Sequence, residues 1–130
     1  MHTANKLHMV SITVGDMKKS KEFYEEKLGL KVTQDYREDD DNWWVTMEFP
    51  GGGAKITLGK AANYGANDPV KPGMVGLYLE TEDIKATHEA LGKKGVEVSD
   101  VQDDLFGPGS GTKFVSITDP DGNSINVLQA

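Results

Sequence analysis

The sequence contains no cysteine, and this absence excludes both disulfide bonds and thiol catalysis. Basic residues are also scarce, because 14 Lys and Arg stand against 21 Asp and Glu, for a net charge of -7. With so few cations the chain offers no basic stripe to neutralise phosphates, so we expect no nucleic-acid partner. The acidic balance favours a neutral or cationic ligand.

Long hydrophobic runs are missing as well. No segment approaches the roughly 18 apolar residues that cross a membrane, and the amino terminus lacks the apolar stretch of a signal peptide. We therefore expect a cytoplasmic protein with no membrane partner.

What the chain does contain is an internal repeat. The runs Met9–Val14 and Met74–Leu79 lie 65 residues apart, and a charged, helix-like segment follows each of them. Each half is too small for a stable core by itself, whereas 130 residues suffice for one domain. We expect a single domain, residues 1–130, with a first module at about 5–60 and a second at about 72–129. The linker between them falls within Gly59–Gly73.

Hydrophobic periodicity predicts the same elements in the same order in both halves. The first half has expected strands at 8–14, 30–36, 43–49 and 55–58, and a helix that Asp16 caps and Gly29 ends. The second half has expected strands at 75–79, 96–98, 113–118 and 124–128, and a helix at 83–94. The prediction is an α+β fold of two βαβββ modules, each with its helix on one face of its sheet.

Alternation along the strands then separates the two faces of each sheet. Val10 and Ile12 face the helix in the first strand, and the adjacent tryptophans Trp43 and Trp44 point to opposite faces. The open faces, away from the helices, are expected to carry Met9, Ser11, Thr13, Trp44, Thr46, Glu48, Lys55, Thr57, Met74, Tyr78, Ser124, Asn126 and Leu128.

Three segments together resemble the vicinal oxygen chelate superfamily, which includes glyoxalase I, bleomycin-resistance proteins and extradiol dioxygenases. They are Val14–Tyr24, Leu28-Gly-Leu30 and Asp119-Pro-Asp-Gly-Asn123, and the resemblance covers essentially the whole chain. It implies paired βαβββ modules whose two mixed, curved sheets enclose a cavity, with helices on the outer faces. It also implies a homodimer.

Enzymes of that superfamily hold a divalent metal through His and Glu side chains from both modules. The resemblance places the corresponding positions at Met9, Thr57, Met74 and Asn126. Divalent ions prefer imidazole and carboxylate ligands, which none of the four supplies, and a Lewis-acid mechanism needs such an ion. Thioethers suit Cu(I), yet two methionines in a cavity are more commonly apolar lining. The sequence therefore predicts no metal and no other cofactor.

The expected ligand site consists of Met9, Ser11, Trp44, Thr57, Met74, Tyr78 and Asn126. The aromatic rings supply contact area, and Thr57 and Asn126 orient hydrogen bonds. Glu48 is a candidate general base. The leading interpretation is a metal-free protein that sequesters a neutral or cationic aromatic small molecule, as bleomycin-resistance proteins do. The alternatives are a metal-dependent lyase, isomerase or dioxygenase resembling glyoxalase I, and an interaction domain without a ligand.

Overall fold

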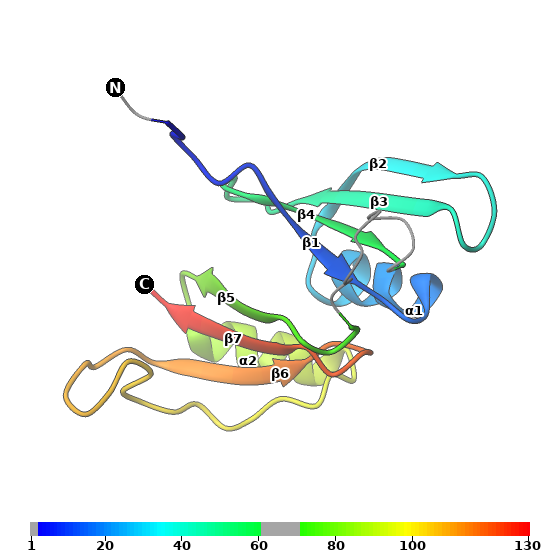
Figure 1. The fold of residues 1–130 in the computed structure, drawn as a ribbon. Helices are drawn as coiled ribbons and strands as arrows, with labels where there is room; N and C mark the ends of the chain where they lie inside the picture. The colour runs from blue at the N-terminus through cyan, green and yellow to red at the C-terminus, as the bar shows by residue number, and fades with distance from the viewer. Residues whose placement is uncertain (1–2, 61–70) are drawn as a thin grey trace. The chain divides into compact units, whose positions relative to one another are not determined.

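The computed structural model of the protein describes residues 3–60 and 71–130 (Figure 1). The chain divides into two compact units, Met1–Pro72 and Gly73–Ala130, called here the first and the second unit and treated separately. Most of the predicted linker, residues 61–70, lies outside the described residues. Within the described part, no helix is both long and apolar enough to cross a membrane.

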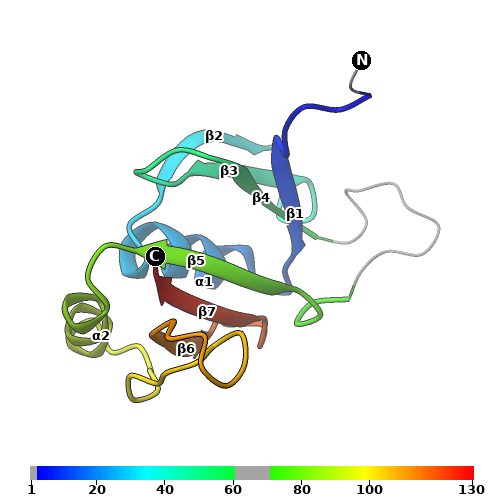
Figure 2. The same cartoon turned by 90° about the vertical axis from the view of Figure 1, so that its left-hand side faces the viewer.

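The first unit contains a four-stranded mixed sheet in the order β1-β4-β3-β2. The strands are β1 (Met9–Thr13), β2 (Lys31–Arg37), β3 (Trp43–Glu48) and β4 (Lys55–Gly59). β1 runs parallel to β4, and the other two pairs are antiparallel. Helix α1 (Met17–Glu22) continues directly into the π-helical turn η1 (Phe23–Lys27), and both lie along one face of the sheet (Figures 1 and 2).

Local sequence explains where this helix begins and ends. The Asp16 side chain accepts a hydrogen bond from the backbone N–H of Lys19 at 3.1 Å, as an N-cap does. The last turn widens, so the N–H of Leu28 bonds to the carbonyl of Phe23, five residues back. Gly29 then turns the chain at a φ of 78°. The predicted cap and stop are both confirmed.

The face of the first sheet that meets the helix forms the core of this unit. Ile12, Val45 and Met47 are completely buried there, while Trp44 and Thr46 alternate with them on the other face and stay partly exposed. Burying such side chains removes apolar area from water at about 25 cal/mol per Å². The alternation predicted for β1 and β3 is therefore confirmed.

The second unit contains a three-stranded mixed sheet in the order β5-β7-β6. Its elements are β5 (Gly76–Thr81), α2 (Ile84–Lys93), β6 (Phe114–Thr118) and β7 (Ser124–Gln129). Asp83 caps α2 by accepting from the N–H groups of Lys85 and Ala86 at 3.1 Å each. The helix packs on one face of the sheet against β6 and β7, where Val115 and Ile125 are completely buried (Figure 1). A mixed sheet with one helix in each unit confirms the α+β class.

The turn between β6 and β7 ties three strands of this unit together. Asn123 is completely buried, and its Nδ2 donates to Oδ2 of Asp119 at 2.7 Å. Its Oδ1 accepts from the N–H of Val75, just before β5, at 2.9 Å. The Asp-Pro-Asp-Gly-Asn motif is therefore more than a turn, because its last residue anchors the entry to a strand that lies far away in the sequence.

The predicted strand at 96–98 is wrong. Residues 96–100 adopt no regular structure, and only a single bridge at Gln102 pairs this segment with Phe114. The Ser99 hydroxyl accepts the N–H of Ser116 at 2.8 Å, so a side chain takes a bond that a neighbouring strand would make. Among the described residues, the second unit thus lacks a counterpart of β2.

Candidate functional site

The open face of the first sheet carries a hollow of about 330 Å³. Six side chains from all four strands line it: Met9, Gln34, Tyr36, Trp44, Thr46 and Thr57. Three of them, Met9, Trp44 and Thr57, belong to the site expected from the sequence. Because the hollow lies on the face opposite α1, its lining is not needed for the packing of the helix.

Two aromatic rings form one wall of the hollow. Tyr36 and Trp44 are paired across β2 and β3, and their ring centroids lie 5.9 Å apart at an angle of 44°. The neighbouring Trp43 points to the helix side, where it is only 7% exposed. The two tryptophans, although adjacent in the sequence, thus lie on different sides of the sheet: Trp43 in the core and Trp44 on the open face. A planar ligand would find its contact area on the second.

Polar groups form the floor of the hollow. Gln34, Thr46, Thr57 and Ser11 follow one another across the sheet as directly paired residues of β2, β3, β4 and β1. The hydroxyl of Thr46 donates to that of Thr57 at 3.4 Å. Ser11 ends this row on the exposed edge strand and does not line the hollow. The floor offers hydroxyl and amide groups, suited to orienting a ligand by hydrogen bonds.

A bulge in β2 explains why sequence reasoning missed Gln34 and Tyr36. The pairing of β2 with β3 shifts between Val32 and Gln34, so one extra residue, Thr33, sits in the strand. Alternation counted from Val32 puts Gln34 and Tyr36 on the helix side, whereas the bulge turns both onto the open face. No residue type in the segment announces this shift.

Glu48, the candidate general base, lies in the next row of the same face. Its carboxylate forms an ion pair with Lys55 at 3.2 Å, and its side chain is 43% exposed. This carboxylate is solvated and already engaged by a cation, so it is not positioned to take a proton from a ligand. The geometry therefore gives no support to catalysis by this residue.

In the second unit, two of the expected site residues meet in one row. Tyr78 of β5 pairs directly with Asn126 of β7, and Asn126 pairs with Ser116 of β6. The Ser116 hydroxyl donates to Oδ1 of Asn126 at 2.7 Å, and the NH₂ group of the same amide is a hydrogen-bond donor. Met74 precedes β5 and is 73% exposed, so it is not part of this row.

The backbone registers correct the alignment of the two halves. Met9 pairs with Lys55 in the first unit, and Gly76 pairs with Ser124 in the second. Met9 also precedes the capping residue Asp16 by seven positions, as Gly76 precedes the cap Asp83. The structural counterpart of Met9 is therefore Gly76 and not Met74. Matching methionines misled the sequence alignment by two residues.

This correction bears on the metal that the resemblance implies. The positions related to metal ligands now carry a thioether at Met9, a hydroxyl at Thr57, no side chain at Gly76 and an amide at Asn126. Such a set does not fit a divalent ion, which prefers carboxylate and imidazole. Among residues 3–60 and 71–130, no group of three or more His, Asp and Glu is placed to hold a metal.

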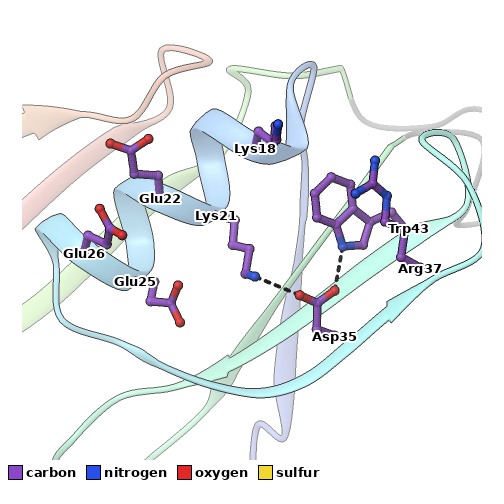
Figure 3. Close-up of a pocket in the computed structure, with 8 residues that line it drawn as sticks. All are labelled: Lys18, Lys21, Glu22, Glu25, Glu26, Asp35, Arg37 and Trp43. Carbon is purple, nitrogen blue, oxygen red and sulfur yellow. Dashed lines mark hydrogen bonds and ion pairs between the residues drawn. The ribbon is translucent and has the colours of Figure 1, made fainter.

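A second hollow, of about 740 Å³, lies on the helix side of the first unit, between α1 and the strands β2 and β3 (Figure 3). The Asp35 carboxylate lines this hollow and has two partners. Its Oδ1 accepts a hydrogen bond from Nε1 of Trp43 at 2.6 Å, and its Oδ2 forms an ion pair with Nζ of Lys21 at 2.8 Å. The Arg37 guanidinium covers the Trp43 ring at 4.1 Å. These contacts connect the helix to the sheet and give the Asp35 carboxylate two partners, Lys21 and Trp43.

The electrostatics of this cluster follow from its contacts. Partial burial tends to raise the pKa of Asp35, but hydrogen bonds from Lys21 and Trp43 outweigh it and hold the pKa below its usual value. The same bond to Asp35 raises the pKa of Lys21. Both groups are thus charged at neutral pH, as a structural ion pair requires.

Each of the two units has a mixed sheet with a helix on one face, and this architecture defines the fold class of the chain. The chain belongs to the glyoxalase/bleomycin resistance protein/dioxygenase superfamily, whose family model matches residues 6–127. The resemblance seen in the sequence is therefore confirmed.

Individual relatives point in more than one direction. The chain is 28% identical to the uncharacterized protein YetH of Bacillus subtilis over 88% of this chain and 89% of that one. It is 29% identical to a "Putative lactoylglutathione lyase" of Brassica oleracea over 92% of this chain, which spans only 44% of the plant protein. The crystal structure of TnmS3, an antibiotic binding protein from Streptomyces sp. CB03234, shares 25% identity and a TM-score of 0.80, covering 99% of this chain and 98% of that one.

Proposed function

We propose that the protein binds a small aromatic molecule without a metal and sequesters it. The observation that carries this proposal is the hollow on the open face of the first sheet, with its aromatic wall and polar floor and with no carboxylate or imidazole at the metal positions. A stacking surface beside a few hydrogen-bonding groups is the usual form of a small-molecule site. The likeness to TnmS3, described as an antibiotic binding protein, supports the same class.

In this proposal, each side chain that lines the hollow makes a different contact with the ligand. Trp44 and Tyr36 stack against a flat ligand, Met9 adapts to its edge, and Thr57 and Gln34 orient it through hydrogen bonds. Asn126 and Tyr78, which lie on the second unit, stay predictions from the sequence. A homodimer and a cytoplasmic location remain predictions, and the oligomeric state is measured directly by light scattering.

Thermal unfolding with a panel of aromatic compounds, neutral and cationic, tests the proposal. A ligand at 100 times its dissociation constant stabilises the folded state by about 2.7 kcal/mol. For a chain of this length that raises Tm by about 10 °C. Trp44→Ala should abolish the shift, because it removes the aromatic wall. Trp43→Phe is the matched control and should retain the shift, since this ring points to the helix side.

A metal-dependent lyase is the second candidate, favoured by the plant relative. Metal analysis of protein purified without chelator separates it from the first. Nickel, zinc, manganese or iron at nearly one equivalent would contradict the proposal. A panel that shifts Tm neither with nor without added metals would favour an interaction domain without a ligand.

A further inference from the structure

Two large aromatic side chains lie exposed together on the second unit. Tyr78 is 62% exposed on the open face of β5, and Phe106 is 65% exposed in the loop before β6. Their ring centroids are 6.2 Å apart, at an angle of 31°. An exposed aromatic pair on the sheet face opposite α2 indicates a binding surface more than a packing contact.

The loop that presents Phe106 is held in place on both sides of it. Oδ1 of Asp104 accepts from the N–H of Gly111 at 2.8 Å, closing the loop. Asp103 forms an ion pair with Lys113 at 2.6 Å where the chain enters β6. The ring is therefore positioned by the loop before any ligand arrives, which lowers the entropic cost of binding.

A carboxylate lies on the same face, two residues beyond Tyr78. Glu80 is exposed, and its strand neighbour Leu128 stands between it and Phe114 in one row across the sheet. Among the described residues, neither a hydrogen bond nor an ion pair engages its side chain. Of the open-face side chains of β5, β6 and β7, only that of Glu80 is charged.

The charge of the second unit has the sign that suits a cation. From Gly73 to Ala130 the sequence has ten Asp and Glu against four Lys, a net charge of -6 out of the -7 of the whole chain. Lys85, Lys93 and Lys94 belong to α2 or its end, on the opposite face, and Lys113 is already paired. Within the second unit, no described lysine is therefore placed to pair with Glu80.

The first unit differs, because Thr13 stands at the position that corresponds to Glu80. Glu48, on the open face of its sheet, lies at the other end of the strands, where Lys55 neutralises it and Lys31 follows in the same row. Its hollow therefore suits an uncharged planar group, whereas the open face of the second unit has aromatic rings beside an unneutralised carboxylate.

We propose that Tyr78, Phe106 and Glu80 form a site on the second unit for an aromatic cation, a compound that carries an organic ammonium or iminium group. The positive group lies over the exposed rings, which attract it through their quadrupoles, and Glu80 supplies the counter-charge. Asn126, one row away, donates its amide to an acceptor on the ligand. The inference rests on the proposed function and specifies its ligand class.

A matched pair of probes tests it by fluorescence titration near pH 8 and at low salt. N-methylacridinium is permanently cationic, and acridine is its uncharged counterpart of almost the same shape. We expect the cation to bind about tenfold more tightly, the difference that a partly desolvated cation–π contact makes. Phe106→Ala and Glu80→Gln should each reduce this preference, and Glu80→Gln should do so by weakening the binding of the cation.

Glu89→Gln is the control, because it removes the same charge from α2 on the opposite face. Equal affinity for the two probes, or an effect of Glu80→Gln no larger than that of Glu89→Gln, overturns the inference and leaves the proposed function standing. Failure of both probes to bind also overturns it. The proposed function would then fail only if no compound of the thermal-unfolding panel raised Tm of the wild type, or if the rise persisted in Trp44→Ala.

Discussion

Replacing the buried Asn123 by alanine tests how the turn motif stabilises the second unit. The substitution removes the amide that donates to Asp119 at 2.7 Å and the carbonyl oxygen that accepts from Val75 at 2.9 Å. The bond to the carboxylate contributes about 2 kcal/mol and the neutral bond about 1 kcal/mol. The backbone N–H of Asn123 keeps its own bond to Asp119. We expect a total loss of about 3 kcal/mol.

Urea denaturation measures this loss. With a slope of about 2 kcal/mol per M, the midpoint should fall by about 1.5 M. Asn42→Ala is the control, because this amide also bonds a carboxylate, that of Asp39 at 3.1 Å, but in a solvent-exposed loop. Its cost should stay below about 0.5 kcal/mol. A loss below about 1 kcal/mol for Asn123→Ala would refute the assignment of a central role to this side chain.

The same experiment tests the single domain expected from the sequence. Both tryptophans, Trp43 and Trp44, belong to the first unit, so fluorescence follows that unit alone, whereas far-UV circular dichroism follows both. Because neither half is large enough for a stable core, the two signals should change together even when the substitution lies in the second unit. Separate transitions would contradict the single domain.

Three further substitutions have defined expected results in the same urea assay. Met47→Ala should cost about 3 kcal/mol, because the side chain is completely buried; a cost below about 1 kcal/mol would contradict this packing. Asp35→Asn should cost about 1 kcal/mol at neutral pH by breaking the pair with Lys21. Since the pKa of Asp35 is lowered, its contribution is complete above the unfolded value near 3.8 and is lost as the pH falls through the folded-state pKa. The difference between wild type and Asp35→Asn should therefore vanish in acid, and a constant difference would contradict the charge-based explanation. Gly73→Ala should cost more than Gly29→Ala, since both have positive φ but a Cβ at Gly73 would lie 2.6 Å from a backbone carbonyl oxygen; equal costs would show that the backbone relaxes there.

Much of the fold could be predicted because the sequence marks it locally. Asp16 and Asp83 cap the two helices as expected, and alternation in β3 correctly separated Trp43 from Trp44. These features depend on a few neighbouring residues and on a strand period of two. Family membership followed from the same local motifs.

The errors arise where tertiary context decides. The bulge at Thr33 moves Tyr36 to the open face, and residues 96–98 form no strand. Phe106 comes next to Tyr78 only through the folding of its loop. None of these outcomes leaves a periodic signal, so the predicted site lacked half of the side chains that line the hollow.

The register of the duplicated strands gives the strongest argument about chemistry. Counterparts in the two units have diverged: Met9 corresponds to Gly76, Ser11 to Tyr78, Thr13 to Glu80 and Trp44 to Phe114. A metal centre with donors from both modules loses one of them at Gly76, which has no side chain with which to supply a ligand. Gly76, the counterpart of Met9 in the second unit, therefore offers no metal ligand. The space around it, beside Tyr78, is open, because a Cβ added there would meet no atom within 4 Å.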